Sequence, residues 1–295
     1  MSPKLARIIA THGRHYLAWA DGALFHSVTR GRKSDIAVGD DVLLRVTAPG
    51  QGVIETCHPR RTLLFRSDRY RVKLLAANVT QLFVLVAAEP TLSDDFLSRA
   101  LIASEAAHIP ARIILNKTDL AEKQAVARQR LQTYVRLGYL VCPVSVTENP
   151  KQAHEVLLPL IQGQTTLLIG QSGVGKSSLI NMILPSADIA TRAISSSLNM
   201  GRHTTTFTRL YALDEQTALI DSPGFHEFGL YHLDRHALEQ AFREFRPGLG
   251  HCRFQDCRHD TEPDCAILAA CDRGEIDPAR HKLYGQLCRE SAHNR

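Results

Sequence analysis

Positions 170–178 of the chain read Gly170-Gln171-Ser172-Gly173-Val174-Gly175-Lys176-Ser177-Ser178, which fits the pattern G-x-x-x-x-G-K-[ST]. A short apolar strand is expected before this run, over 165–169, and an apolar-faced helix after it, over 178–184. This order lets backbone N–H groups at a helix N-terminus converge on phosphate oxygens. Lys176 would then contact the β- and γ-phosphates, and the Ser177 hydroxyl would bind Mg²⁺. The alternative is a glycine-rich turn with a surface lysine, but the flanking strand and helix favour a nucleotide site.

A second motif comes earlier in the chain, which is an unusual order. Residues 116–119 read Asn116-Lys117-Thr118-Asp119 and fit N-K-x-D, the pattern with which GTPases read guanine. In ordinary GTPases the phosphate loop comes first, whereas here the base-reading motif precedes it by about fifty residues. Either one of the two motifs is accidental, or the G domain is circularly permuted.

The surroundings of the earlier motif fit base reading. An apolar strand expected over 112–115 would deliver Asn116 to the carboxyl edge of a sheet, where open α/β folds bind ligands. Asp119 can accept from guanine N1–H and N2–H₂, a pair of donors that adenine lacks. Lys117 would lie along the base, and Asn116 would brace the loop or approach N7. The alternative is that Thr118 or Asp119 caps the following helix.

Three further segments complete the set of motifs that a GTPase uses. Asp221-Ser222-Pro223-Gly224 matches D-x-x-G, which holds Mg²⁺ and senses the γ-phosphate, although this motif alone is a common turn. Residues 201–206 (GRHTTT) offer hydroxyls to Mg²⁺, with Thr205 the expected ligand, and Ser145 and Val146 end another expected strand beside the base. We therefore expect GTP to contact residues 116–119, 145–146 and 170–178 with Asp221 and Gly224, and Mg²⁺ to bind Ser177, Thr205 and Asp221.

A cluster of soft metal ligands lies near the C-terminus. It comprises Cys252, Cys257, His259 and Cys265, within fourteen residues. Three thiolates and an imidazole suit tetrahedral Zn²⁺, and the surrounding segment is too poor in apolar residues to fold without a metal. The alternative is a set of incidental or redox thiols, and Cys271 competes for a ligand place. The remaining cysteines are expected to be plain thiols: Cys57, Cys142 and Cys288.

The N-terminal part is basic and rich in short strands. Residues 1–73 carry 13 Lys/Arg against 6 Asp/Glu, whereas the whole chain has 35 against 30. Such a local excess is typical of nucleic-acid binding, the alternative being an ordinary solvated surface. About five short strands separated by Gly and Asp turns predict a small barrel such as the OB-fold. Of Tyr16, Trp19 and Phe25, we expect at least two to pack in the barrel core instead of stacking on bases.

Together, these motifs and the Cys/His cluster resemble those of the ribosome small-subunit-dependent circularly permuted GTPases, the RsgA or YjeQ family. The resemblance covers essentially the whole chain. It implies an N-terminal OB-fold barrel, a central permuted G domain and a C-terminal zinc module that act on the small ribosomal subunit. It also favours Cys265 over Cys271 as the fourth zinc ligand.

The expected fold class is therefore multidomain α/β. The expected parts are an OB-fold barrel over 1–62, a basic connector over 63–77, a permuted G domain over 78–230 and a zinc-binding module over 231–295. In the G domain, strands alternate with helices, which favours a mainly parallel sheet. No apolar run approaches the length of a membrane span and no apolar signal segment opens the chain, so we expect the protein to stay in the cytoplasm. We also expect a monomer.

The catalytic residues are the least defined part of the prediction. Phe225 follows D-x-x-G, where Ras-type enzymes have a glutamine that orients the attacking water, so hydrolysis should be slow without help. His203 is the best local substitute, and the resemblance points the same way; His226 is a weaker one. The alternative for His203 is a loop histidine that binds backbone or RNA. Lys176, His203 and Thr205 are the expected catalytic residues.

The sequence thus predicts a GTP hydrolase that binds the small ribosomal subunit and its rRNA and assists its late maturation. The subunit would stimulate hydrolysis, and hydrolysis would time release. The alternative is a GTP-gated RNA-binding checkpoint module in which hydrolysis is incidental. A permuted GTPase of the large subunit or of a membrane is disfavoured by the attached barrel and zinc loop.

Overall fold

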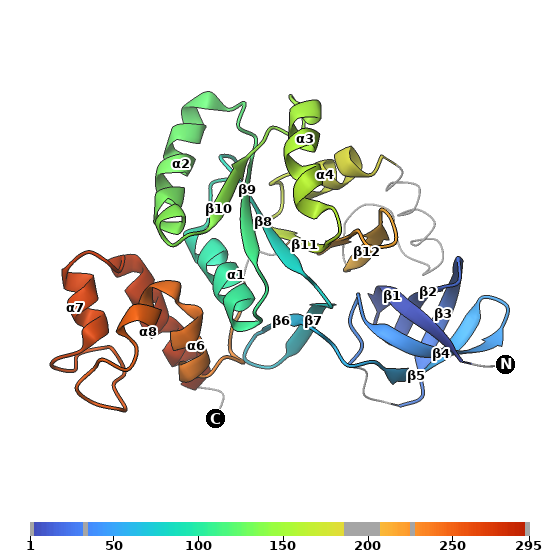
Figure 1. The fold of residues 1–295 in the computed structure, drawn as a ribbon, viewed down its shortest axis with the longest axis horizontal. Coiled ribbons are helices and arrows are strands. Elements are labelled where there is room, and N and C mark those ends of the chain that lie inside the picture. Colours follow the sequence, from blue (N-terminus) through green and yellow to red (C-terminus); the bar gives the residue numbers. More distant parts are fainter. Residues whose placement is uncertain (1–2, 32–34, 186–206, 225–227, 293–295) are drawn as a thin grey trace.

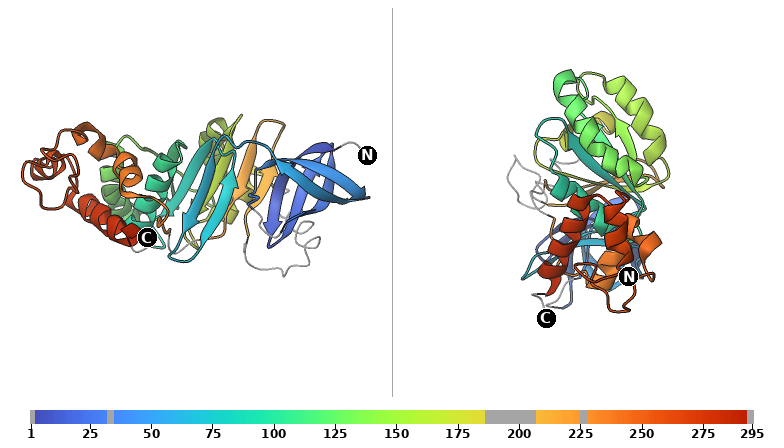
Figure 2. Two further views of the ribbon diagram at one scale, coloured as in Figure 1. Left: turned by 90° about the horizontal axis from the view of Figure 1, so that it is seen from below. Right: turned by 90° about the vertical axis from the view of Figure 1, so that its left-hand side faces the viewer.

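A computed structural model describes residues 3–31, 35–185, 207–224 and 228–292 of the 295-residue chain (Figure 1). A barrel, an α/β domain and a small helical module follow one another along the long axis, as Figure 2 shows. This is the fold class that the sequence predicts. The segment 201–206 with His203 and Thr205, together with Phe225 and His226, lies outside the described residues.

The barrel is built from five strands: β1 (Lys4–His12), β2 (His15–Ala20), β3 (Ala23–Thr29), β4 (Asp41–Ala48) and β5 (Gln51–Cys57). They pair in the order β1-β2-β3-β5-β4, and β4 pairs back to β1 and closes the barrel. Alternate side chains of these strands point inward and form a separate apolar core. Tyr16 and Phe25 are buried there, while Trp19 is 45% exposed, so the expectation that at least two of the three pack inside is confirmed.

The α/β domain has a mainly parallel sheet in the order β10-β9-β8-β11-β13-β12. Its strands are β8 (Gln81–Ala87), β9 (Ala111–Asn116), β10 (Leu140–Pro143), β11 (Thr165–Gly170), β12 (Arg209–Ala212) and β13 (Ala218–Asp221). Its helices are α1 (Asp94–Ala106), α2 (Ala121–Arg136), α3 (Pro150–Ile161) and α4 (Lys176–Ile183). Residues of α1 and α2 pack on one face and residues of α3 and α4 on the other, so β8 is buried along its whole length.

The barrel and this sheet are continuous. β1 pairs antiparallel with β12 at a single position, Ala10 with Arg209, which makes one sheet of 11 strands. Phe207 packs on Ala10 and Leu17 at the outer face of the barrel, and the Arg209 guanidinium lies 4.1 Å from the centre of the Phe207 ring. The first strand of the chain is therefore part of the same sheet as β11 and β13, which precede the phosphate-loop pattern and D-x-x-G.

Residues 63–77, expected as a basic connector, form an antiparallel hairpin of β6 (Leu63–Ser67) and β7 (Val72–Ala77). At its barrel end, the Asn78 side chain donates to the Gly39 carbonyl over 2.9 Å. At its other end, the Ser67 N–H donates to the Gly229 carbonyl over 3.0 Å, and the Ser67 hydroxyl lies 2.7 Å from His232 Nδ1. The hairpin therefore joins the barrel to the segment that follows D-x-x-G.

The half-buried His232 should make stability depend on pH. Burial lowers the pKa of His232 from 6.5 to about 4, so the unfolded chain binds more protons between these two values. The contribution of neutral His232 to the free energy of unfolding is therefore fully present above pH 6.5. It is lost as the pH decreases toward 4, and it amounts to about 2 kcal/mol after discounting for partial exposure. We expect His232→Phe to lose this part of the pH dependence, measured as urea midpoints at pH 7.5 and pH 5. Equal midpoint shifts in the wild-type protein and the variant would contradict this expectation.

The C-terminal module consists of α6 (Arg235–Ala241), a 3₁₀ turn (Arg243–Gly248), α7 (Ala266–Asp272) and α8 (Pro278–Ala292). Helix α6 packs against α1, and the buried Arg99 of α1 pairs with Glu290 of α8 over 2.7 Å. Arg243 pairs with Glu105 of α1 over 2.7 Å, which adds a second link to the α/β domain. Within the described ranges, no helix combines the length and the apolar character that a membrane crossing requires.

Candidate functional site

The phosphate-loop pattern lies between β11 and α4 at the centre of the sheet, since β8 and β13 flank β11. Gly175 precedes α4 with a φ of +100°, a conformation that favours glycine. A Cβ at Gly175 would lie 2.3 Å from Asn116 Nδ2, and one at Gly170 would lie 2.7 Å from the Leu85 carbonyl oxygen. These close approaches explain why the loop needs glycine at both positions.

Lys176 opens helix α4 and folds back over the loop. Its ammonium group donates to the carbonyls of Gly170 and Gln171 over 2.8 and 3.0 Å. Burial lowers the pKa of Lys176, and the nearby Asp221 carboxylate opposes that shift. The cation is thus held at the mouth of the loop, where a nucleotide would place its terminal phosphates.

Asn116 joins the base-reading motif to the phosphate loop. Its side chain is 2% exposed and donates from Nδ2 to the Val174 carbonyl over 3.0 Å. Its Oδ1 accepts from the Val146 N–H over 3.1 Å. Of the two roles considered for Asn116, the structure shows the bracing one.

The Asp119 carboxylate is positioned by a partner from the next loop, because the Ser145 hydroxyl donates to it. Neither Thr118 nor Asp119 caps the following helix: Leu120 is the N-cap residue of α2 and makes no side-chain cap hydrogen bond. The capping alternative is therefore excluded. Strand β10 ends at Pro143, earlier than the expected 146, because Ser145 and Val146 turn inward to meet the N-K-x-D loop.

The D-x-x-G segment meets the phosphate loop from the other side. Asp221, 4% exposed, ends β13 opposite Leu168 of β11, and the Ser222 hydroxyl donates to the Leu168 carbonyl over 2.7 Å. A Cβ at Gly224 would lie 3.2 Å from the Ser172 backbone nitrogen and 3.4 Å from Lys176 Nζ. The structure thus brings together residues 116–119, 145–146, 170–178 and 221–224, all of them predicted from the sequence.

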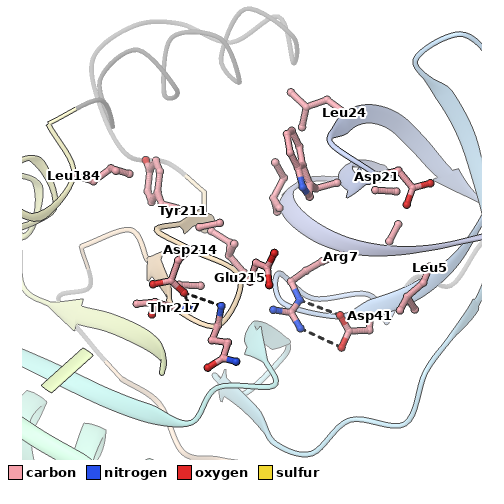
Figure 3. A pocket seen from close by; sticks show the side chains of 18 residues that line it. Leu5, Arg7, Asp21, Leu24, Asp41, Leu184, Tyr211, Asp214, Glu215 and Thr217 are labelled. Atoms are coloured by element: carbon pink, nitrogen blue, oxygen red, sulfur yellow. Dashed lines mark hydrogen bonds and ion pairs between the residues drawn. The ribbon is translucent and has the colours of Figure 1, made fainter. Parts of the chain in front are cut away.

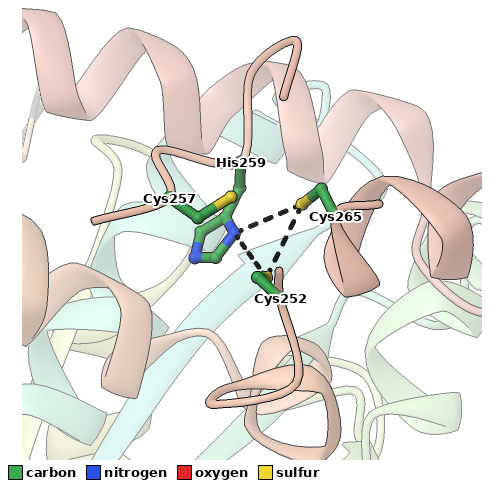
Figure 4. Close-up of side chains that lie close together, drawn as sticks. All are labelled: Cys252, Cys257, His259 and Cys265. Atoms are coloured by element: carbon green, nitrogen blue, oxygen red, sulfur yellow. Dashed lines mark hydrogen bonds between the residues drawn. The ribbon is translucent and has the colours of Figure 1, made fainter. Parts of the chain in front are cut away.

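The four predicted metal ligands also come together (Figure 4). One ligand atom from each of Cys252, Cys257, His259 and Cys265 lies within 4.8 Å of the others. The Cys252 and Cys265 sulfurs are 3.8 Å apart, and His259 Nδ1 is 3.6 and 3.4 Å from them. Two sulfurs about 2.3 Å from a tetrahedral Zn²⁺ would be separated by about 3.8 Å, so this spacing fits the ion. Cys271 is not part of the group.

The pKa values of the cysteine thiols also favour a bound metal ion. Burial raises the pKa of both Cys257 and Cys265, which disfavours thiolates there unless a cation is bound. A bound divalent cation reverses this preference and deprotonates coordinating thiols. The cluster is therefore suited to a metal ion and poorly suited to free thiolates.

A residue that the sequence does not reveal lies behind the cluster. His259 presents Nδ1 to the sulfurs, and its Nε2 lies 3.7 Å from Oε1 of Glu239 on α6. The Tyr284 hydroxyl of α8 donates to the same Glu239 oxygen over 3.2 Å. A carboxylate behind a metal-binding histidine orients the ring and raises its basicity. No local pattern marks Glu239, because only the packing of α6 on the metal loop brings it there.

Comparison with known proteins identifies the family to which the chain is similar. Residues 57–231 match the family model described as RsgA GTPase. The curated "Small ribosomal subunit biogenesis GTPase RsgA" of Burkholderia pseudomallei (strain K96243) is 53% identical over 288 residues, covering 97% of this chain and 92% of the relative. The protein of the same name from Paraburkholderia phytofirmans is 51% identical over 292 residues, with the same coverage.

Two solved structures share the fold over nearly the whole chain. The crystal structure of YjeQ from Thermotoga maritima has a TM-score of 0.73 at 26% identity and covers 99% of this chain and 100% of that one. The structure of YloQ, described as a circularly permuted GTPase, has a TM-score of 0.70 at 25% identity and covers 99% and 96%.

Proposed function

The chain belongs to the RsgA family of GTPases, and we propose that this GTP hydrolase acts in the biogenesis of the small ribosomal subunit. It would bind the subunit and its rRNA late in maturation, and hydrolysis would time its release. The curated relatives, which match over 97% of the chain, are named for this role, and the incidental-hydrolysis alternative has no such support. We place the protein in the cytoplasm, as a monomer.

The proposed nucleotide site is supported mainly by the buried Asn116 side chain. It forms hydrogen bonds both to the phosphate loop and to the Ser145–Val146 turn. Guanine would lie against Lys117 and Asp119, and the phosphates over the 170–178 loop. Ser177, Asp221 and Thr205 offer the oxygen ligands that Mg²⁺ prefers. The bound ion would neutralise charge on the β- and γ-phosphates, while Lys176 stabilises the same charge from the protein side.

The RNA-binding part of the proposal rests on charge. Arg66, Arg69, Arg71 and Lys73 gather on the β6–β7 hairpin, next to the basic barrel. Burial lowers the pKa of Lys73, and the nearby Arg66 cation lowers it further, so at least two positive charges lie close together there. A phosphate backbone would relieve that crowding. We propose the domain limits 1–62, 63–77, 78–230 and 231–295, with the hairpin counted as its own segment.

Co-sedimentation tests the partner. The protein with a non-hydrolysable GTP analogue should pellet with purified small subunits, and not with large subunits at the same concentration. Because phosphate contacts release counterions, the bound fraction should fall steeply as salt increases from 50 to 200 mM. Equal binding to both subunits would reject a specific role in small-subunit biogenesis.

We further propose that the Cys₃His cluster holds one structural Zn²⁺, and Glu239 offers a sensitive test of it. Elemental analysis should find one zinc per chain, and Cys257→Ser should lose it and unfold the C-terminal module while GTP binding persists. Glu239→Gln should retain zinc but release it to a chelator at about 10- to 100-fold lower competitor concentration, because the carboxylate no longer orients His259.

Glu275→Gln is the matched control for this series. Glu275 pairs with Arg273 on the surface, and both side chains are more than half exposed, so zinc affinity should not change. A wild-type protein without zinc would remove the metal proposal itself. Zinc present in the wild type and held equally tightly by Glu239→Gln would remove only the role of Glu239.

A further inference from the structure

An open groove lies between the barrel and the β12–β13 turn and shares no lining residue with the nucleotide or metal sites (Figure 3). It has a volume of about 640 Å³. Strands β1 and β2 form one side, and β12 with the following turn forms the other. The groove opens where β1 and β12, which pair only at Ala10 with Arg209, part from one another.

The barrel side of the groove exposes large apolar side chains. Leu5 is 62% exposed and Trp19 is 45% exposed, and both line the groove. Further along the same outer face, Ala10 and Leu17 are fully buried because Phe207 covers them. Apolar side chains therefore continue along this face beyond the part that Phe207 covers. Exposed apolar surface of this kind is typical of a site where a partner binds.

The charge of the groove is opposite to that of the barrel around it. Its lining contains the carboxylates of Asp21, Asp41, Asp214 and Glu215 and a single guanidinium, that of Arg7. Arg7 is already paired with Asp41, and Lys4 beside the groove is paired with Asp21, both over 2.9 Å, so Asp214 and Glu215 are the lining carboxylates for which the described residues supply no ion pair. The negative charge of Asp214 and Glu215 disfavours phosphates and favours cationic side chains at this end of the groove.

Glu215 is the carboxylate best placed to meet a partner. Asp214 accepts hydrogen bonds from the backbone N–H groups of Gln216 and Thr217 over 2.8 and 2.7 Å, which fixes the turn. Glu215 is exposed at the tip of that turn and extends toward the barrel side in Figure 3. Among the described residues, no cation forms an ion pair with it.

We propose that this groove binds an extended, arginine-bearing segment of a partner protein. The Trp19 indole offers a face for cation–π stacking and Glu215 offers a carboxylate for ion pairing, and arginine is better suited to both contacts than lysine. Aliphatic side chains of the same segment would cover Leu5 and Leu24, which line the groove. The groove thus gives the protein a protein-binding surface beside its proposed RNA-binding one.

Trp19 is the only tryptophan of the chain, so its fluorescence reports on this groove alone. A ten-residue peptide of alternating arginine and leucine should change the Trp19 emission saturably. Glu215→Lys should weaken this binding at least tenfold, and Glu215→Gln should weaken it at least threefold. Glu155→Lys is the matched control: Glu155 is exposed on α3, outside the groove, and its reversal should leave peptide affinity unchanged.

Unchanged GTP turnover and melting temperature would establish that the Glu215 variants are folded. The proposal is overturned if the peptide leaves Trp19 emission unaltered, or if both Glu215 variants bind it as tightly as the wild type. It is also overturned if a ten-uridine oligonucleotide changes Trp19 emission with the affinity of the peptide, because the groove would then bind RNA.

Discussion

Asp119→Asn should change the base preference of the nucleotide site from guanine to xanthine. The Asp119 carboxylate can accept from guanine N1–H and N2–H₂ together, whereas an asparagine amide offers one acceptor and a donor that suits the xanthine O2. Losing two charge-assisted hydrogen bonds, each worth about 1.5–3 kcal/mol, should weaken GTP binding by about 10²–10³-fold or more. Competition of GTP, XTP and ATP against a fluorescent guanine nucleotide measures the change.

Ser145→Ala separates base reading from loop support. It removes the hydroxyl that donates to the Asp119 carboxylate but leaves the carboxylate in place. We expect about tenfold weaker GTP binding and no gain for XTP, since one hydrogen bond to a charged group is lost. Equal affinity of the wild type for ATP and GTP, or an unaltered preference in Asp119→Asn, would reject the assignment of the base site.

GTP turnover should be slow in the free protein and faster by about 10³–10⁵-fold on the small ribosomal subunit, the range over which a partner completes a GTPase site. The reason lies in the sequence after D-x-x-G, where Phe225 can neither donate nor accept a hydrogen bond. The subunit would seat Thr205 on Mg²⁺ and place His203 beside the attacking water. Single-turnover rates with and without purified subunits measure the effect.

Three single substitutions, one of them a control, test which residues contribute to the subunit-stimulated turnover. His203→Ala should abolish most of the stimulated rate and spare GTP affinity, whereas Lys176→Ala should impair nucleotide binding itself. His236→Ala is the matched control, because the His236 side chain is 80% exposed on α6 and belongs to none of the nucleotide motifs. Equal turnover with and without subunits would contradict partner-completed catalysis. Full stimulated activity in His203→Ala would remove only the role of the histidine.

The α/β domain and both sites were predictable because their chemistry is local in sequence. The helix after the phosphate loop was expected from 178 and begins at Lys176, since Gly175 ends the loop directly before it. The Cys₃His ligands fall within one loop, so their spacing alone suggested a metal. His203, Thr205 and the residues after Gly224 stay predictions, because they lie outside the described residues.

What the sequence could not show depends on contacts between distant residues. The hairpin at 63–77 read as a connector, and its Ser67 contacts with Gly229 and His232 join segments more than 160 residues apart. Glu239 approaches His259 only because α6 packs beside the metal loop. The acidic groove likewise forms from two segments about 200 residues apart, neither of which looks unusual alone.

The continuous sheet also fixes the order in which a ribosome can complete this protein. The barrel closes from its first 57 residues, because β1 pairs with both β2 and β4. Its outer positions Ala10 and Leu17 then remain uncovered until Phe207 has been synthesised, about 200 residues later. Strand β11 likewise gains its second neighbour only when β13 has been synthesised, whereas the guanine-reading motif at 116–119 precedes both strands. We therefore expect the nucleotide site to be complete only after Asp221 and Gly224 have been synthesised.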